Sequence, residues 1–203
     1  MRFDKTASLT AFIALSVTLF AQSLFAQTRA QEPFGVEPGQ TPVLETSVGY
    51  TFIHANAPPG QCGCFSANGG YGSVVFHLPR NFAAVADLAA VHSNTVGATS
   101  QSITVFNYLF GPRYTFRPVF KRYLPYGQIL GGGSQELSSY ATAQNLHGAA
   151  FSVGGGLGAT LNPHFGWTIF EADWVHSYIP NAQNNLQNDL RISSGFTFRL
   201  GPR

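Results

Sequence analysis

Alternation of apolar and polar residues is the dominant pattern along this chain. Between Leu190 and Leu200 the even positions carry mostly large apolar side chains, whereas the odd positions carry Arg, Ser, Gly and Thr. Successive side chains of a β-strand point to opposite faces, so this segment predicts a strand with one apolar and one polar face. Further segments alternate in the same way over about ten residues each. The predicted strands span 44–55, 69–79, 81–92, 103–116, 123–133, 149–161, 166–179 and 190–200.

The segments between these strands alternate in length. The short ones are 79–81, 117–122 and 162–164. The long ones are rich in Asn, Gln, Ser and Gly, and they are 56–68, 93–102, 134–148 and 180–189. Short periplasmic turns and long extracellular loops are typical of outer-membrane barrels. The pattern therefore predicts an all-β fold, an eight-stranded antiparallel up-and-down transmembrane barrel.

The N-terminal segment is expected to direct export. Arg2 and Lys5 precede an uncharged, mostly apolar run that ends in small residues. This pattern predicts a secretory signal peptide over 1–26, cleaved after Ala26. A single transmembrane anchor is the alternative, because the run is long enough to span ~30 Å of hydrocarbon. Residues 27–43 are expected to be a flexible periplasmic lead-in, and 44–203 the barrel.

Alternation does not by itself decide which face is inside, because a soluble barrel such as a lipocalin has the same pattern turned inside out. Composition favours the membrane. Charged residues make up 10% of the chain, against ~25% in soluble domains. The small residues of the polar face suit the narrow lumen of an eight-stranded barrel. We therefore expect the apolar face to contact outer-membrane lipid, including the side chains of Phe106, Phe110, Phe170, Phe196 and Phe198.

The aromatic residues other than phenylalanine support this orientation. Tyr50, Tyr114, Trp174 and Tyr178 share the apolar face and lie toward the ends of their strands. Girdles of Trp and Tyr occur at these levels in membrane barrels, where the bilayer meets water.

The polar face carries a few charged side chains, which would lie in the lumen. Opposite charges in a narrow lumen are expected to pair, because an isolated buried charge is very unfavourable. We expect a network of salt bridges that closes the lumen, and a narrow or gated ion path is the alternative. The residues of this expected network are Asp87, Arg113, Glu171, Asp173, Arg191 and Arg199.

Two cysteines, Cys62 and Cys64, lie in the first long loop. Outside the cytoplasm they predict a disulfide. A ring across one intervening residue is strained, because bonded cysteines prefer Cα separations of ~5.5–6 Å, so an interchain bond or free thiols stay open. A metal site would need more ligands, for which His54 or His92 are candidates. We expect no metal and no cofactor.

Catalytic motifs do not emerge from the sequence. His92 and Ser93 are adjacent, as are His176 and Ser177, so each pair would point to opposite faces of its strand. Such pairs cannot act together as base and nucleophile. The glycine-rich stretches lack the Lys and the following helix of a phosphate-binding loop. Lys and Arg are not clustered as a nucleic-acid surface requires. We expect neither an enzyme nor a nucleic-acid partner.

Four stretches resemble the small eight-stranded outer-membrane barrels, namely the OmpA-like transmembrane domain, the opacity-type porins and barrels of the Acidobacteria type. They read "CGCFSANGGYGS", "NFAAVADLAAVHS", "FEADWVHSY" and "RISSGFTFRLG". The resemblance covers nearly all of residues 44–201. One departure is that the class usually ends its last strand on an aromatic residue, whereas Phe198 is followed by "RLGPR".

Together these features predict a monomeric, non-enzymatic protein of the cell outer membrane. Its role would be structural or would lie in contacts between the long loops and surface ligands. One alternative is a porin-like pore for ions or small solutes. Another is a soluble periplasmic barrel that binds a lipid or other ligand.

Overall fold

The computed structural model describes residues 44–55, 65–96, 102–120, 122–139, 145–180 and 185–200. The expected signal peptide, the expected lead-in and both cysteines lie outside these residues. No helix in the described parts of the chain is long and apolar enough to cross a membrane.

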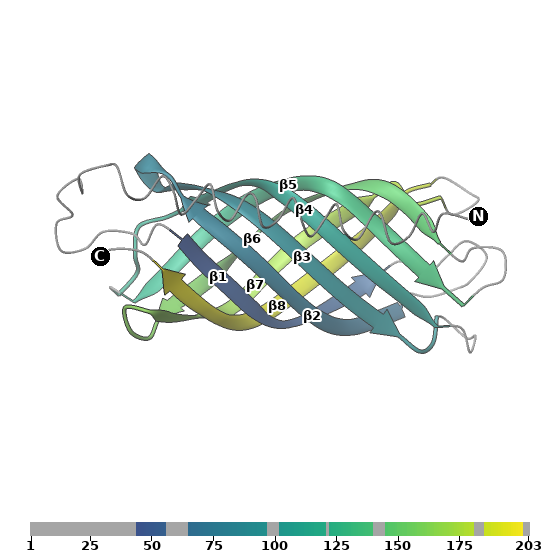
Figure 1. Ribbon diagram of the computed structural model, residues 1–203, viewed down its shortest axis with the longest axis horizontal. Coiled ribbons are helices and arrows are strands. Elements are labelled where there is room, and N and C mark those ends of the chain that lie inside the picture. The colour runs from purple at the N-terminus through teal and green to yellow at the C-terminus, as the bar shows by residue number, and fades with distance from the viewer. Residues whose placement is uncertain are drawn as a thin grey trace, which may run out of the picture. The chain divides into compact units, whose positions relative to one another are not determined.

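Eight strands form a single closed barrel (Figure 1). Each strand pairs antiparallel with the next along the chain, and the first pairs with the last, so no edge is left open. The expected fold class is therefore confirmed. The strands are β1 (Leu44–Ala55), β2 (Phe65–His77), β3 (Phe82–Ser93), β4 (Ile103–Thr115), β5 (Tyr123–Ser138), β6 (Leu146–Thr160), β7 (Phe165–Ser177) and β8 (Gln187–Leu200).

The strands are longer at the end with the long loops than the sequence pattern predicts. β2 begins at Phe65, β5 continues to Ser138, β6 begins at Leu146 and β8 begins at Gln187. Residues that we expected in loops are thus paired, as in Ala55↔Phe65. These strand ends are rich in Gly, Ser, Asn and Gln, so the backbone pairs there without the apolar alternation that marks the rest of each strand.

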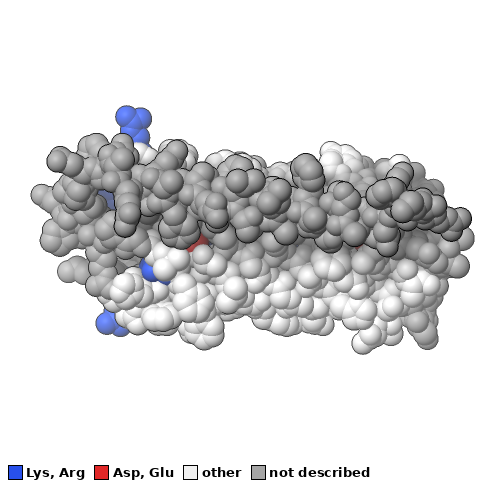
Figure 2. Space-filling view, in the orientation of Figure 1, with Lys and Arg blue, Asp and Glu red and all other residues white. Residues whose placement is uncertain are grey.

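The wall of the barrel is apolar outside and polar inside. On β8, the outward-facing Phe196 is 61% exposed, whereas Arg191, which points into the barrel from the same strand, is 0% exposed. Phe110 on β4 is 64% exposed and Asp87 on β3 only 2%. The described wall seen in Figure 2 is accordingly white over most of its length, and its blue atoms gather toward the end where β1 begins. This is the reverse of the polarity that water imposes on a soluble barrel.

A β-bulge in β7 keeps this polarity consistent. The register of β7 shifts between Thr168 and Glu171 against β8, and a shift also occurs against β6. Before the bulge the odd position Trp167 is exposed, and after it the even position Trp174 is exposed. An extra residue reverses the alternation, so both tryptophans face outward while Glu171 and Asp173 face inward.

The short turns lie at the end of the barrel where β1 begins. Pro79–Asn81 forms a single 3₁₀ turn between β2 and β3. Asn162 Oδ1 accepts hydrogen bonds from the backbone N–H groups of His164 and Phe165 in the β6–β7 turn. Among the described residues, the exposed charged side chains all lie in two of these turns, and they are Arg80, Arg117 and Arg122.

Candidate functional site

Charged side chains from four strands meet inside the barrel, with Arg191 of β8 at their centre. Its guanidinium bonds the carboxylate of Asp87 on β3. Its Nη2 lies 2.7 Å from Asp173 Oδ2 and 3.4 Å from Glu171 Oε1, both on β7. Arg191 is fully buried, so bulk water does not reach its guanidinium group. A rigid, always charged guanidinium with several donors suits a site of this kind.

Arg113 of β4 extends the cluster on the other side of Glu171. Its Nη2 lies 3.1 Å from Glu171 Oε2, and its Nε and Nη2 donate to Gln128 Oε1 at 3.0 and 2.6 Å. Tyr126 donates its hydroxyl to Glu171 Oε2 at 2.6 Å, and its ring lies 4.0 Å from the Arg113 guanidinium carbon. Gln128 Nε2 then donates to Asp173 Oδ1 at 3.0 Å, which joins the two arginine groups.

We call this cluster the lumen network; its members are Asp87, Arg113, Tyr126, Gln128, Glu171, Asp173 and Arg191. It places three carboxylates beside two guanidinium groups. Each charge has an opposite charge and hydrogen bonds, which offset the unfavourable burial of ions. Because the side chains reach across from β3, β4, β7 and β8, the network occupies the lumen and ties distant strands together.

Arg199 does not belong to the lumen network, contrary to our expectation. Its Nε lies 2.7 Å from Glu45 Oε1, and its Nη1 donates to Thr160 Oγ1 at 3.0 Å. His77 Nε2 lies 3.4 Å from Glu45 Oε2. These residues stand at the ends of β1, β2, β6 and β8 that adjoin the short turns. Arg199 shares the inward face with Arg191, but eight residues along a tilted strand separate the two.

Apolar side chains also fill part of the lumen, which sequence reasoning did not foresee. At the end with the long loops, one buried cluster lines β1 to β4 and consists of Ile53, Ala55, Phe65, Ala67, Val91, Val96 and Ile103. A second comprises Val75, Ala83, Val85, Leu109, Leu130 and Ala150. The only sequence signal was the presence of valine, isoleucine and leucine at inward positions of strands whose outward positions are also apolar.

Glycines make room for the bulky inward side chains. A Cβ on Gly154 would lie 2.2 Å from Asp173 Oδ1, and one on Gly156 would lie 2.6 Å from the Tyr126 hydroxyl. The inward ring of Tyr71 likewise comes within 2.8 Å of a Cβ built on Gly49.

Tyr126 and Gln128 were missed as site residues, although the shared parity of Tyr126, Gln128 and Leu130 in the sequence is the signal that finds them.

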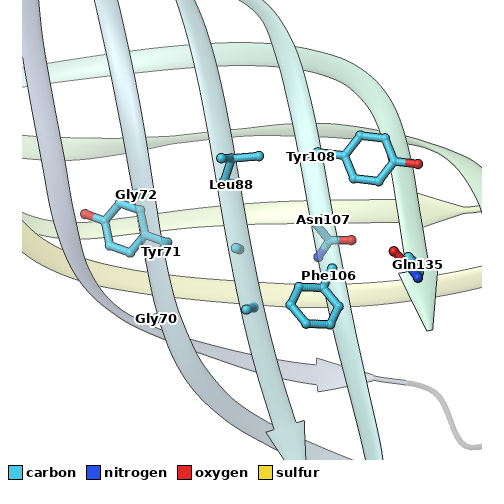
Figure 3. Close-up of a pocket in the computed structure, with 10 residues that line it drawn as sticks. Gly70, Tyr71, Gly72, Leu88, Phe106, Asn107, Tyr108 and Gln135 are labelled. Atoms are coloured by element: carbon cyan, nitrogen blue, oxygen red, sulfur yellow. The ribbon is translucent and has the colours of Figure 1, made fainter. Parts of the chain in front are cut away.

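The outer wall carries the five phenylalanines that we expected to face lipid. All are exposed on the outside of the barrel; they are Phe106, Phe110, Phe170, Phe196 and Phe198. A shallow hollow of about 470 Å³ lies on this wall across β2, β3 and β4. Leu88, Phe106 and Tyr108 stand around it, and Gly70 and Gly72 lie on its β2 side (Figure 3).

The candidate metal ligands have other partners. His54 Nδ1 lies 3.2 Å from Ser66 Oγ, and His92 bonds Thr104 and Asn94. Within the described ranges, no group of three or more His, Cys, Asp or Glu residues could hold a metal ion. Ser93 is buried while His92 is exposed, as expected for neighbours on one strand.

No protein-family model and no curated protein sequence matches this chain. Solved structures do. Neisserial surface protein A superposes with a TM-score of 0.59 at 12% identity, over 77% of this chain and 97% of that one. Ail, the attachment invasion locus protein of Yersinia pestis, gives 0.53 at 13% identity, over 78% and 100%. Ail in complex with the heparin analogue sucrose octasulfate gives 0.50 at 14% identity, over 76% and 97%.

These likenesses extend over nearly the whole length of each solved chain, and at this identity they concern the fold. The expected resemblance is therefore confirmed at the level of architecture. The described chain has the fold of the small eight-stranded outer-membrane barrels.

Proposed function

We propose that this chain is an integral protein of the cell outer membrane, whose barrel holds four long loops at the cell surface in a structural or surface-interaction role. The observation that carries this proposal is the polarity of the wall, with aromatic and aliphatic side chains outside and ions within. Export would use the signal peptide expected over 1–26.

The physical argument rests on what surrounds the outer wall. Large apolar side chains are exposed on every strand, among them Val48 on β1, Leu88 on β3, Ile129 on β5 and Trp174 on β7. A soluble monomer seldom exposes an apolar surface that is continuous over a few hundred Å². Acyl chains match such a surface, and a closed barrel satisfies its backbone groups without help from water. The same closure supports a monomer, since no strand edge is available for pairing.

The contents of the lumen favour an anchor over a pore. The lumen network and the two apolar clusters occupy the interior of an eight-stranded barrel, which is only just wide enough for its own side chains. A path for ions would require the buried pair of Arg191 and Asp173 to separate. We therefore place the function in the loops, which connect β1 to β2, β3 to β4, β5 to β6 and β7 to β8.

Ligand contact by the loops is the specific version of this proposal. One of the solved structures with this fold, Ail, is recorded in complex with a heparin analogue, sucrose octasulfate. By analogy of fold alone, sulfated polysaccharide is the first ligand class to test on the intact cell surface. Binding of labelled heparin to cells that produce the protein, and none to cells that lack it, would support it.

Fractionation of the producing cells tests the location. The protein should remain in the outer-membrane pellet after osmotic shock and should need detergent for extraction. Unheated samples should migrate differently from boiled samples on a denaturing gel, because folded barrels of this class resist detergent. Release by osmotic shock without detergent would instead indicate the soluble periplasmic barrel.

A further inference from the structure

Four histidines, each paired across its hairpin with another polar residue, are spaced around the outside of the barrel. His54, His92, His147 and His176 each lie near the end of a strand that adjoins a long loop. Each pairs directly across its hairpin with a neutral polar residue: His54↔Ser66, His92↔Thr104, His147↔Gln135 and His176↔Asn188. We call these eight residues the histidine girdle. Every strand contributes one member, and every hairpin that carries a long loop contributes one histidine.

The histidine girdle lies immediately above the apolar wall. The next outward residue toward the middle of each histidine strand is apolar, and these residues are Phe52, Ala90, Ala149 and Trp174. Given the proposed membrane location, on which this inference rests, the girdle stands at the level of the headgroups in the extracellular leaflet. The opposite end of the barrel differs, because its exposed charges are the permanent cations Arg80, Arg117 and Arg122.

We propose that the histidine girdle binds the phosphate groups of the surrounding leaflet lipid, and that binding strengthens as the histidines gain protons. Imidazole is the side chain whose charge ordinarily changes between about pH 5 and 8, so this is the range over which the proposal is tested. A basic side chain near an anionic lipid surface strengthens attraction by ~1 kcal/mol, which corresponds to about fivefold in affinity.

His176 shows the required geometry most clearly. Its Nδ1 donates to Asn188 Oδ1 at 2.7 Å, so the neutral ring carries its lone pair on Nε2. A proton added at Nε2 creates a second donor without breaking the first bond. Phe151, Trp174 and Tyr178 surround the ring at centroid distances of 5.1, 5.5 and 4.9 Å. Aromatic faces at this range favour a cation.

The neighbours of the girdle do not supply competing charges on the outer face. His54 faces Ser66 on β2 and Leu190 on β8. His92 faces Asn68 on β2 and Thr104 on β4. His147 faces Gln135 on β5, and His176 faces Phe151 on β6 and Asn188 on β8. Tyr178, which directly follows the end of β7, is the titratable group whose ring contacts His176 from the same segment of the chain. The carboxylates at this level, Glu136 and Asp189, point into the lumen and are buried.

Trp174 provides a reporter, since its ring centroid lies 5.5 Å from that of His176. The full chain with Trp167→Phe, which leaves Trp174 as the sole tryptophan, is folded into phosphatidylcholine vesicles. One set of vesicles contains brominated phosphatidylcholine and the other contains brominated phosphatidylglycerol. The phosphate of phosphatidylglycerol keeps its charge over the pH range used. The ratio of quenching by the two lipids reports their relative affinity beside His176.

This ratio should shift about fivefold toward phosphatidylglycerol between pH 8 and pH 5. His176→Gln keeps a hydrogen-bonding side chain and should abolish the shift. His164→Gln, in the β6–β7 turn at the other end of the barrel, should leave it intact. A ratio that is constant with pH, or one that shifts equally in His176→Gln, would overturn this inference and leave the membrane location standing. Absence of quenching by either lipid would overturn both.

Discussion

At the scale of single residues, Arg191 is the fully buried cation of the lumen network. It bonds carboxylates on β3 and β7 from its own position on β8. Removing one partner of a buried ion pair is far more damaging than replacing the whole pair, because the remaining charge is left without compensation. The arginine therefore carries a stability effect that its neighbours in the wall do not.

We expect Arg191→Met to lower the free energy of unfolding by ~3–5 kcal/mol, since it leaves Asp87 and Asp173 buried without their cation. Urea titration of the protein folded in vesicles measures this change. Arg80→Met, at an exposed turn, is the matched control and should change stability by less than ~0.5 kcal/mol. Equal effects of the two substitutions would show that the lumen network does not stabilise the barrel.

The inward glycines provide a second test at this scale. Gly154→Ala would bring a methyl group within 2.2 Å of Asp173 Oδ1 and 2.3 Å of a backbone oxygen, so we expect a loss of ~1–3 kcal/mol. Gly131 is instead exposed on the outer wall, where a Cβ would meet nothing within 4 Å, so Gly131→Ala should be tolerated. The same urea titration compares the two. A larger loss at Gly131 would contradict the packing of the lumen described above.

At the scale of the strand, the sequence predicts which side chains face outward wherever apolar and polar residues alternate without interruption. The prediction fails where pairing with the neighbouring strands reverses the alternation or lengthens the strand. In β8 every even position from Leu190 to Leu200 lies outside or half-buried, as the pattern predicts. In β7 the bulge after Thr168 reverses the parity of Trp167 relative to Trp174, and such a bulge depends on the register of both neighbouring strands. The added length of β5 depends likewise on its partners β4 and β6.

β8 offers a direct comparison of its two faces. Phe196→Arg places a charge on the outer wall, for which we expect a loss of ~2–4 kcal/mol near the bilayer midplane. Ser193→Thr keeps the inward hydroxyl that lies 2.8 Å from Thr51 Oγ1, and the loss should be far smaller. Unfolding in vesicles measures both. Similar losses would mean that the outer and inner faces of the strand are not in lipid and lumen as assigned.

At the scale of the whole molecule, parity within strands predicted which charges point inward but not which of them meet. The meeting of Asp87, Glu171 and Arg191 depends on how far each tilted strand is shifted along its neighbours, a quantity that accumulates around the barrel. Arg199 was therefore assigned to the wrong group, and Glu45 was not recognised as its partner. The apolar clusters of the lumen were missed because a polar interior was expected throughout.

The side chains inside the barrel predict an electrical property. We expect planar bilayers that contain the folded protein to show no discrete conductance steps at moderate voltage, because the lumen network and the apolar clusters fill the interior. Stable unitary currents from the unmodified protein would require the pore function instead.

The orientation of the wall is the claim on which the membrane assignment depends, and the two native tryptophans test it without any substitution. Trp167 and Trp174 are 43% and 45% exposed on the outside of β7. In vesicles whose acyl chains carry bromine, we expect most of the tryptophan emission to be quenched, and iodide in the surrounding water should have little effect. Emission that iodide quenches and brominated chains do not would place the outer wall in water.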